Sequence, residues 1–382
     1  MVYGLKSIKL RIRLIWRILQ IGFRAYGNPV IALQALIKTG KMRNQVQGNQ
    51  FIPRFLESNN LHYWSPFCPG FPSVAFDNFI ENELHRSISF RSSAPRLMTI
   101  IFSITSRCPL QCKHCFEWDN LNTPEPMTLD DLKLTLKKFQ AFGVDQVQIS
   151  GGEPTVRFDD MIELVETSEP ETNFMLLTSG YNLTRENAER IKKAGFVGVN
   201  ISLDHWIPEL HNDMRGSEQA FDWAMDAAKN TRAVDLMLYF SLCATRSFVT
   251  EENIWKYLEL TSSLGAGFIQ ILEPRAVGNF KDKQVDLSEN QYKILEKFFL
   301  TVNNDRQYQE MPIVVFHGYH QRKMGCFGAG ERYLFVDANC DIHACPFCQE
   351  KYGNGLVDSI PESIERIGSS GCQKFAKAVV DI

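Results

Sequence analysis

The chain has 382 residues, of which 44% are hydrophobic and 22% are charged, and its formal net charge is −3. A chain of this length can bury a large core, and its net charge excludes a protein that binds polyanions over its whole surface. The first 54 residues nevertheless hold ten basic residues and no acidic one. The sequence therefore predicts an acidic body that carries a basic N-terminal arm.

The basic arm is predicted to be helical. In residues 5–27, Ile8, Ile12 and Ile15 recur at helical spacing, and most of the basic residues fall on another face. Residues 28–42 predict a second, shorter amphipathic helix. Arginines interrupt the apolar pattern too often for a transmembrane span.

Basic amphipathic helices are typical of segments that lie in the interface of an anionic membrane. We therefore expect residues 1–50 to associate with a membrane surface. Three alternatives are a helix packed on the protein's own acidic body, a basic arm for nucleic acid and an organelle transit peptide. We favour the membrane surface and expect no nucleic-acid partner.

Residues 51–96 are rich in Pro, Phe, Asn and Ser, and we expect them to form an irregular but ordered segment. Residues 97–305 then show six strand–helix units in succession. Such alternation predicts an α/β fold with a parallel sheet and right-handed crossovers. Six units can form an open doubly wound sheet or a barrel with a missing arc. In both folds, functional residues gather at the C-terminal ends of the strands.

Eight of the ten cysteines fall in two groups, and Cys68 and Cys243 stand alone. No secretory signal is visible, so we expect a cytoplasmic protein, peripheral on the inner face of the membrane, whose grouped cysteines bind metal and do not form disulfides. The early group is Cys108, Cys112 and Cys115, and the late group is Cys326, Cys340, Cys345, Cys348 and Cys372.

The early cysteines, with the spacing CxxxCxxC, lie on the loop that leaves the first predicted strand. Three thiolates on such a loop can hold one face of a cubane iron–sulfur cluster and leave one iron open for chemistry. A zinc site is the alternative. It needs a fourth ligand, and His114 lies between two of the cysteines, too close in sequence to complete the site easily.

This motif resembles that of the radical S-adenosylmethionine (radical SAM) enzymes, which carry it after the first strand of a partial (β/α)6 barrel. The resemblance implies that Cys108, Cys112 and Cys115 bind three irons of a [4Fe–4S] cluster, and that the amino and carboxylate groups of S-adenosylmethionine chelate the fourth. It further implies reductive cleavage of this cofactor to a 5′-deoxyadenosyl radical that abstracts hydrogen from a substrate. The electron would come from a reductant such as ferredoxin or flavodoxin.

Other motifs extend the resemblance. "GGEP" ends the second predicted strand, where its glycines would let the backbone approach a ligand and Glu153 would accept from the methionine ammonium group. "TSG" offers Ser179 to the ribose, and "SLD" offers Ser202 and Asp204. Arg215 in "LHNDMRG" would pair with the cofactor carboxylate. By resemblance, the S-adenosylmethionine site comprises Gly151, Gly152, Glu153, Pro154, Ser179, Ser202, Asp204 and Arg215.

The late cysteines in residues 306–382 resemble the Twitch or SPASM extension of this family. The resemblance implies a small Cys-rich domain with one auxiliary [4Fe–4S] cluster. The expected ligands are Cys326, Cys345, Cys348 and Cys372. Cys340 falls where relatives have a turn glycine, and it is the substitute ligand if Cys372 lies too far away. Four thiolates also suit zinc, which is the alternative at this site.

The substrate class stays open. A ribosomally made peptide, a lipid at a membrane surface and a small soluble metabolite are the three candidates, and a zinc-binding membrane adaptor is the non-enzymatic one. His317, Tyr319 and His320 are candidate pocket residues. Glu273 and Arg275 follow the last predicted strand and are further candidates for substrate contact.

Overall fold

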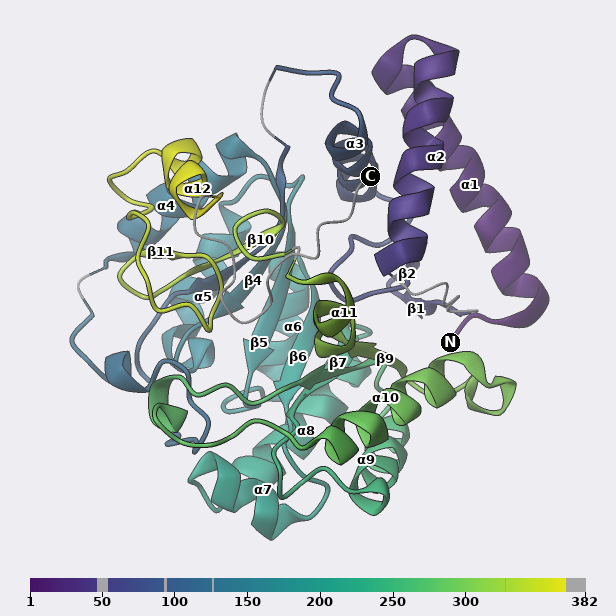
Figure 1. Cartoon of the computed structure of the whole chain (residues 1–382). Helices are drawn as coiled ribbons and strands as arrows, with labels where there is room; N and C mark the ends of the chain where they lie inside the picture. The colour runs from purple at the N-terminus through teal and green to yellow at the C-terminus, as the bar shows by residue number, and fades with distance from the viewer. Residues whose placement is uncertain (47–53, 93–94, 126, 327, 369–382) are drawn as a thin grey trace.

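The computed structural model describes residues 1–46, 54–92, 95–125, 127–326 and 328–368. In this part of the chain, a sheet of nine strands forms an incomplete barrel (Figure 1). All neighbouring strands pair in parallel except the last two at one edge, which are antiparallel. From that edge, the order is β11 (Ile342–His343), β10 (Tyr333–Val336), β3 (Leu97–Ser103), β4 (Val144–Ser150), β5 (Asn173–Thr178), β6 (Phe196–Ser202), β7 (Met237–Cys243), β8 (Phe268–Leu272) and β9 (Ile313–Phe316).

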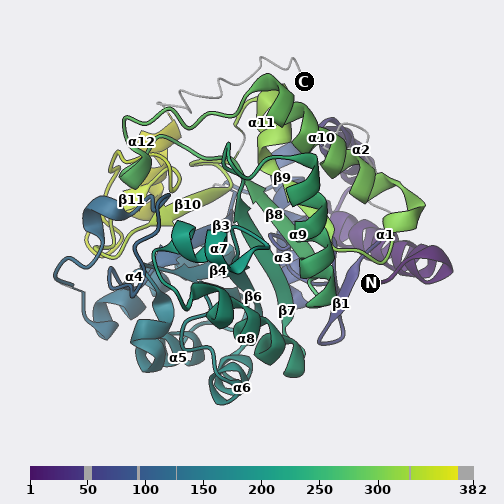
Figure 2. The same ribbon diagram turned by 90° about the horizontal axis from the view of Figure 1, so that it is seen from below.

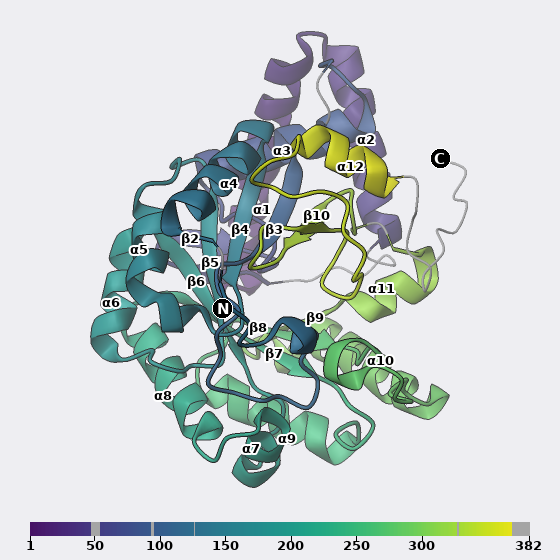
Figure 3. The same cartoon turned by 90° about the vertical axis from the view of Figure 1, so that its left-hand side faces the viewer.

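Helices follow one another around the outside of the strands (Figure 3). Their ends carry the expected signals: the side chain of Thr128 forms a capping box with Asp131, and Gly143 ends the same helix with a φ of 106°. The outer helices are α4 (Leu129–Phe142), α5 (Phe158–Glu166), α6 (Arg185–Ala194), α8 (Ala220–Ala233), α9 (Glu251–Ser263) and α10 (Glu289–Asn304).

The predicted α/β fold with six strand–helix units is confirmed, and the sheet extends beyond it at both edges. Strand β9 follows α10 and pairs with β8, so the barrel sheet continues past residue 305. Strand β10 pairs in parallel with β3, with Tyr333 opposite Thr99. Figure 2 shows β10 and β11 at one edge of the sheet. The late cysteine region is thereby joined to the strand that carries the early cysteines.

The two faces of the barrel strands differ. One set of alternate residues, such as Phe102, Ile149 and Phe240, packs under the outer helices in the main apolar core. The other set faces the barrel interior, because successive strand residues point to opposite sides. Near the starts of the strands this interior set is apolar, with Met237 and Phe268 among its members.

Residues 51–96 were expected to form an irregular but ordered segment, and about half of their described residues lie in regular elements. They contain the hairpin β1 (Leu56–Ser58) and β2 (Leu61–Tyr63) and the helix α3 (Val74–Ser87). Leu56 and Tyr63 pack against Met237 and Phe268, so the hairpin closes the N-terminal end of the barrel. The strands are only three residues long, which is too short for an alternating pattern to be recognised.

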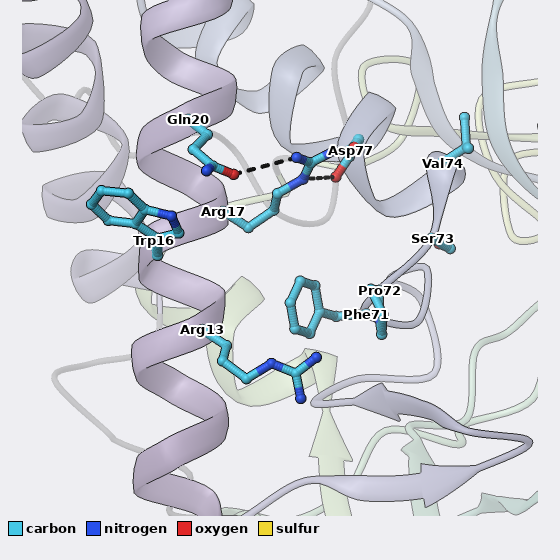
Figure 4. Close-up of a pocket in the computed structure, with 9 residues that line it drawn as sticks. All are labelled: Arg13, Trp16, Arg17, Gln20, Phe71, Pro72, Ser73, Val74 and Asp77. Carbon is cyan, nitrogen blue, oxygen red and sulfur yellow. Dashed lines mark hydrogen bonds and ion pairs between the residues drawn. The ribbon is translucent and has the colours of Figure 1, made fainter.

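The N-terminal arm forms two helices, α1 (Gly4–Tyr26) and α2 (Pro29–Val46), as predicted. They lie side by side and stand away from the barrel, next to α3 (Figure 1). Arg17 of α1 reaches across to the Asp77 carboxylate of α3, while Trp16 lies at the rim of the groove between the two helices (Figure 4). No helix among the described residues is long and apolar enough to cross a membrane.

Candidate functional site

The early cysteines lie on the loop after β3, at the C-terminal end of the barrel. Leu110, Ala220 and Trp223 pack around them and form an apolar wall. Burial raises the pKa of the Cys108 and Cys115 thiols to about 12, and it also raises the pKa of Cys112. Thiolates are therefore unfavourable here without a positive partner, and an iron cluster supplies one. The chemistry of the three thiols and their apolar wall fits an iron–sulfur cluster.

Contacts from distant segments hold the cysteine loop. Two backbone carbonyls of the short helix α7 (Pro208–Arg215) accept hydrogen bonds from the loop. The Gln111 N–H donates to Arg215 O at 3.2 Å, and the Lys113 N–H donates to Met214 O at 2.9 Å. Asn279 donates its backbone N–H to Cys115 O at 2.9 Å and its side-chain amide to Cys112 O at 3.2 Å.

Asn122 forms a further reciprocal pair with the backbone of Cys108: it accepts at 2.9 Å and donates at 3.3 Å. Sequence reasoning missed both Asn122 and Asn279. For Asn122 the available signal was an asparagine in a turn, because it adopts a φ of 58°.

The glycines of "GGEP" contact the cysteine loop. A Cβ on Gly152 would lie 2.5 Å from Arg107 O, and one on Gly151 would lie 2.6 Å from Thr105 O. The Gly152 N–H donates to Thr105 O at 2.8 Å. These glycines were expected to admit a ligand to the backbone. In the structure their missing side chains leave room for the backbone of the cysteine loop, which packs directly against them because the ends of β3 and β4 are adjacent.

Glu153 is buried and links the ends of β4 and β5. Its Oε1 accepts from the Thr155 and Thr178 hydroxyls at 2.8 and 2.7 Å, and its Oε2 accepts from the Ser179 N–H and hydroxyl at 2.8 and 2.6 Å. Pro154 begins the short helix that follows. The structure thus brings Glu153 and Ser179 together. The Glu153 carboxylate already accepts hydrogen bonds from Thr155, Thr178 and Ser179 of the protein itself.

Asp204 is the centre of a buried charge cluster. Its Oδ2 lies 2.7 Å from His114 Nε2 and 2.8 Å from Arg215 Nε, and its Oδ1 accepts from the Cys243 N–H at 3.0 Å. Burial alone would raise the pKa of Asp204, but Arg215 and His114 outweigh it and hold the pKa well below its usual range.

Arg215 was expected to pair with the cofactor carboxylate. In the structure its Nη1 donates to Cys112 Sγ at 3.7 Å, and its Nε pairs with Asp204. The end of α7 carries both this side chain and the carbonyl that holds the cysteine loop. Ser202 lies at the end of β6, opposite Ser241 of β7.

The late cysteines divide into two groups. Cys345 Sγ and Cys348 Sγ are 3.3 Å apart. The contact with Cys348, burial and, to a smaller extent, Cys326 raise the pKa of the Cys345 thiol. Cys340 instead belongs to the main apolar core, where its Sγ accepts from the Thr135 hydroxyl at 3.4 Å. Its φ of 64° fits the turn position at which relatives carry glycine. Cys340 is therefore poorly placed as a substitute ligand, and Cys372 lies outside the described residues.

A salt-bridge cluster lies after β8, beside the helix α11 (His317–Met324). Glu273 is buried and pairs with Arg322 of α11 and with Arg275. His317 lies against Phe67, with 4.9 Å between ring centroids, and Tyr319 accepts from Lys323 Nζ at 2.6 Å. His320 packs edge-on against Phe299. These residues position α11, which leads to Cys326.

Within the described residues, no three His, Cys, Asp or Glu side chains converge on a single metal-ion position. A cubane cluster does not need such convergence, because each of its thiolate ligands binds a different iron.

A model of the radical SAM superfamily matches residues 102–260. The chain is 26% identical over 288 residues to the AdoMet-dependent heme synthase of Methanosarcina barkeri, covering 69% of this chain and 80% of that protein. It is 28% identical over 279 residues to the mycofactocin maturase MftC of Mycobacterium tuberculosis, covering 69% and 68%.

Two solved structures share the fold. SuiB of Streptococcus suis bound to its precursor peptide SuiA has a TM-score of 0.58 at 14% identity, covering 87% of this chain and 77% of that one. The enzyme anSMEcpe with bound AdoMet and a peptide has a TM-score of 0.58 at 18% identity, covering 74% and 84%. These two structures show the shared fold. The family model and the sequence relatives, together with the cysteine loop at the C-terminal end of a partial barrel, show that the chain belongs to the radical SAM superfamily and is an enzyme that uses a [4Fe–4S] cluster and S-adenosylmethionine.

Proposed function

We propose that this enzyme abstracts a hydrogen atom from a peptide or a polar small molecule that binds inside the barrel, next to the cysteine loop. The observation that carries the proposal is the lining of the barrel interior. Beyond the apolar layer at the closed end, several inward positions are uncharged and polar, and they alternate with apolar ones such as Leu177 and Val315. The polar positions include Ser103, Gln148, Ser150, Asn200, Ser202, Ser241 and Gln270.

These polar positions are neighbours across the sheet. Ser103 pairs with Ser150, and Ser241 of β7 pairs with both Ser202 and Gln270. The Ser103 hydroxyl is buried and makes no hydrogen bond among the described residues. Hydroxyl and amide groups that face the barrel interior favour a ligand that can satisfy them, such as a peptide backbone or a hydroxylated metabolite, over a lipid chain.

When bound, the cluster and S-adenosylmethionine supply one-electron cleavage of the sulfonium and hence a carbon radical that abstracts hydrogen. The protein supplies the surroundings. Cys108, Cys112 and Cys115 hold three irons, and Arg215 donates to the Cys112 sulfur. The β1–β2 hairpin packs on the apolar layer at the N-terminal end of the barrel and closes that end. We assign the S-adenosylmethionine contacts to Gly151–Pro154, Ser179, Ser202 and Asp204 at the strand ends, and to Arg215 at the end of α7.

We further propose one auxiliary [4Fe–4S] cluster, held by Cys326, Cys345, Cys348 and Cys372, that carries electrons. The proximity of Cys345 and Cys348 supports it. Zinc at these thiols is the alternative, and metal analysis separates the two.

The names of the relatives also support a peptide or small-molecule substrate. The mycofactocin maturase and SuiB, which binds a precursor peptide, favour the peptide, whereas the heme synthase favours a small molecule. The proposed location is the cytoplasm, where reduced ferredoxin or flavodoxin is available as the electron donor.

The test uses the reconstituted full-length protein under anaerobic conditions with S-adenosylmethionine and dithionite. Release of 5′-deoxyadenosine is measured alone and with separate peptide, polar-metabolite and lipid fractions of a cell extract. We expect the peptide or polar-metabolite fraction to stimulate release, and Cys112→Ala to abolish it. Stimulation by the lipid fraction alone would overturn the proposed substrate class.

Variants at the polar positions inside the barrel sharpen the test. Gln270→Ala and Ser241→Ala should lose the stimulation by substrate and keep the iron content and the slow release without substrate. Gln219→Ala, which changes an exposed glutamine outside the barrel, is the matched control. Equal stimulation in all three variants would show that the substrate binds elsewhere.

A further inference from the structure

The helices α1 and α2 expose a large apolar surface. Leu10, Leu14 and Ile21 of α1 are buried against the protein. On the opposite side of the helix, Ile8, Ile12 and Ile15 are 51%, 63% and 58% exposed. The two helices together are called the α1–α2 hairpin. Its apolar face is defined by the exposed side chains Leu5, Ile8, Ile12, Ile15, Trp16 and Phe23 of α1 and Leu33 and Ile37 of α2.

The basic residues of the α1–α2 hairpin divide into two sets. Arginines attach it to the body of the protein: Arg17 pairs with Asp77, Arg24 pairs with Glu81, and Arg13 lies over the Phe71 ring at 5.9 Å.

The lysines of the hairpin are exposed instead. Lys6, Lys9, Lys38 and Lys41 form no ion pair with a carboxylate within the described chain. The acidic body is therefore the partner of the arginines, and the lysines remain available beside the apolar face.

This combination identifies the occupant of the apolar face. Two copies of the hairpin facing each other would bring together basic residues with no acidic residue to pair with, because the first carboxylate of the sequence is Glu57. An anionic lipid surface offers both an apolar phase and negative charge. Trp16 and Phe23 suit the boundary between headgroups and acyl chains.

We propose that the α1–α2 hairpin docks peripherally on an anionic lipid bilayer, with α1 lying in the plane of the interface. This inference does not rest on the proposed substrate. The hairpin lies behind the barrel when the cysteine-loop end faces the viewer (Figure 3). The docked enzyme therefore receives its substrate from the aqueous side.

Vesicle flotation of the full-length protein tests the proposal. Vesicles of equimolar phosphatidylcholine and phosphatidylglycerol should carry the protein upward, and vesicles of phosphatidylcholine alone should carry much less. Ile12→Ser and Phe23→Ser should each lower binding about tenfold, because each removes apolar area from the membrane. Lys6→Ala and Lys9→Ala should each lower it about fivefold at low salt.

Matched controls lie elsewhere on the surface. Leu134→Ser removes an apolar side chain that is 50% exposed on α4, and Lys137→Ala and Lys193→Ala remove exposed lysines of the barrel helices. These variants should bind vesicles as the unchanged protein does, and all variants should keep their 5′-deoxyadenosine release in solution.

Two results would overturn the proposal. One is the absence of flotation with anionic vesicles. The other is a dimer in solution that Ile12→Ser dissociates while vesicle binding is unchanged, which would make the apolar face a protein–protein interface.

Discussion

Arg215 links Asp204 to the cysteine loop: its Nε lies 2.8 Å from Asp204 Oδ2, and its Nη1 lies 3.7 Å from Cys112 Sγ. Both charged groups are buried. Burial alone would lower the pKa of Arg215, but Asp204 and Cys112 raise it above its usual value. The pair therefore stays ionised, and the guanidinium positions a sulfur that binds the cluster.

Replacement of Arg215 by Met should destabilise the metal-free protein by about 3–5 kcal/mol, because Asp204 stays buried without its cation. In the reconstituted protein, the lost hydrogen bond to the Cys112 sulfur should lower the reduction potential of the cluster. Urea unfolding and a potentiometric titration measure the two effects. Arg185→Met, which breaks an exposed pair with Glu189, should change neither. An unchanged potential in Arg215→Met would refute the positioning role.

Gly152→Ala should impair cluster assembly. The added Cβ would lie 2.5 Å from Arg107 O, so the cysteine loop must shift, at a cost of about 1–3 kcal/mol. Iron per chain after reconstitution is the measurement. Gly40→Ala in α2, where no atom lies within 4 Å of the new Cβ, is the control and should load iron fully. Full loading of both variants would contradict the packing argument.

The late cysteines should hold a second cluster. The unchanged protein should contain about eight irons, and Cys345→Ala or Cys372→Ala should reduce the content to about four. Cys340→Ala should keep about eight irons and lose only stability, because Cys340 packs in the apolar core. About four irons with zinc in the unchanged protein would contradict the proposed second cluster. A loss of iron in Cys340→Ala would contradict the proposed ligand set.

Glu153→Gln should destabilise the metal-free protein by about 2–4 kcal/mol. One carboxylate oxygen becomes an NH2 group, which faces hydroxyl or N–H donors of Thr178 or Ser179 and leaves a buried polar group unsatisfied. Chemical denaturation measures the change. Glu163→Gln, at an exposed pair with Lys133, should shift the free energy of unfolding by about 0.5 kcal/mol or less.

In the metal-free protein, His317 and His211 should each contribute a loss of stability as the pH falls from about 6.5 to about 4. Burial raises the pKa of Glu117 and Asp145 to about 7, and these two carboxyls contribute in the opposite direction. Desolvation, together with His320, lowers the pKa of His317 to about 4, and burial lowers that of His211 to about 4. At these two histidines the unfolded chain binds more protons than the folded chain in this window, so their protonation favours unfolding. His317→Gln should reduce the slope of the unfolding free energy against pH. A slope equal to that of the unchanged protein would exclude His317 as a contributor.

The local features of this protein follow from its sequence. Apolar periodicity determined the strand–helix alternation and both N-terminal helices, and Thr128 and Gly143 marked the ends of a helix, because these signals act within a few residues. The spacing of Cys108, Cys112 and Cys115 and its position after a strand identified the cluster loop.

The tertiary structure decided what depends on distant contacts. It brought Arg215 to Cys112, placed Cys340 in the core and closed the barrel with a hairpin of three-residue strands. It also showed that the outer face of α1 is apolar, because only packing against α3 determines which side of an amphipathic helix is buried. Sequence periodicity gives the faces of a helix or strand, whereas the partner of each face is set by the fold as a whole.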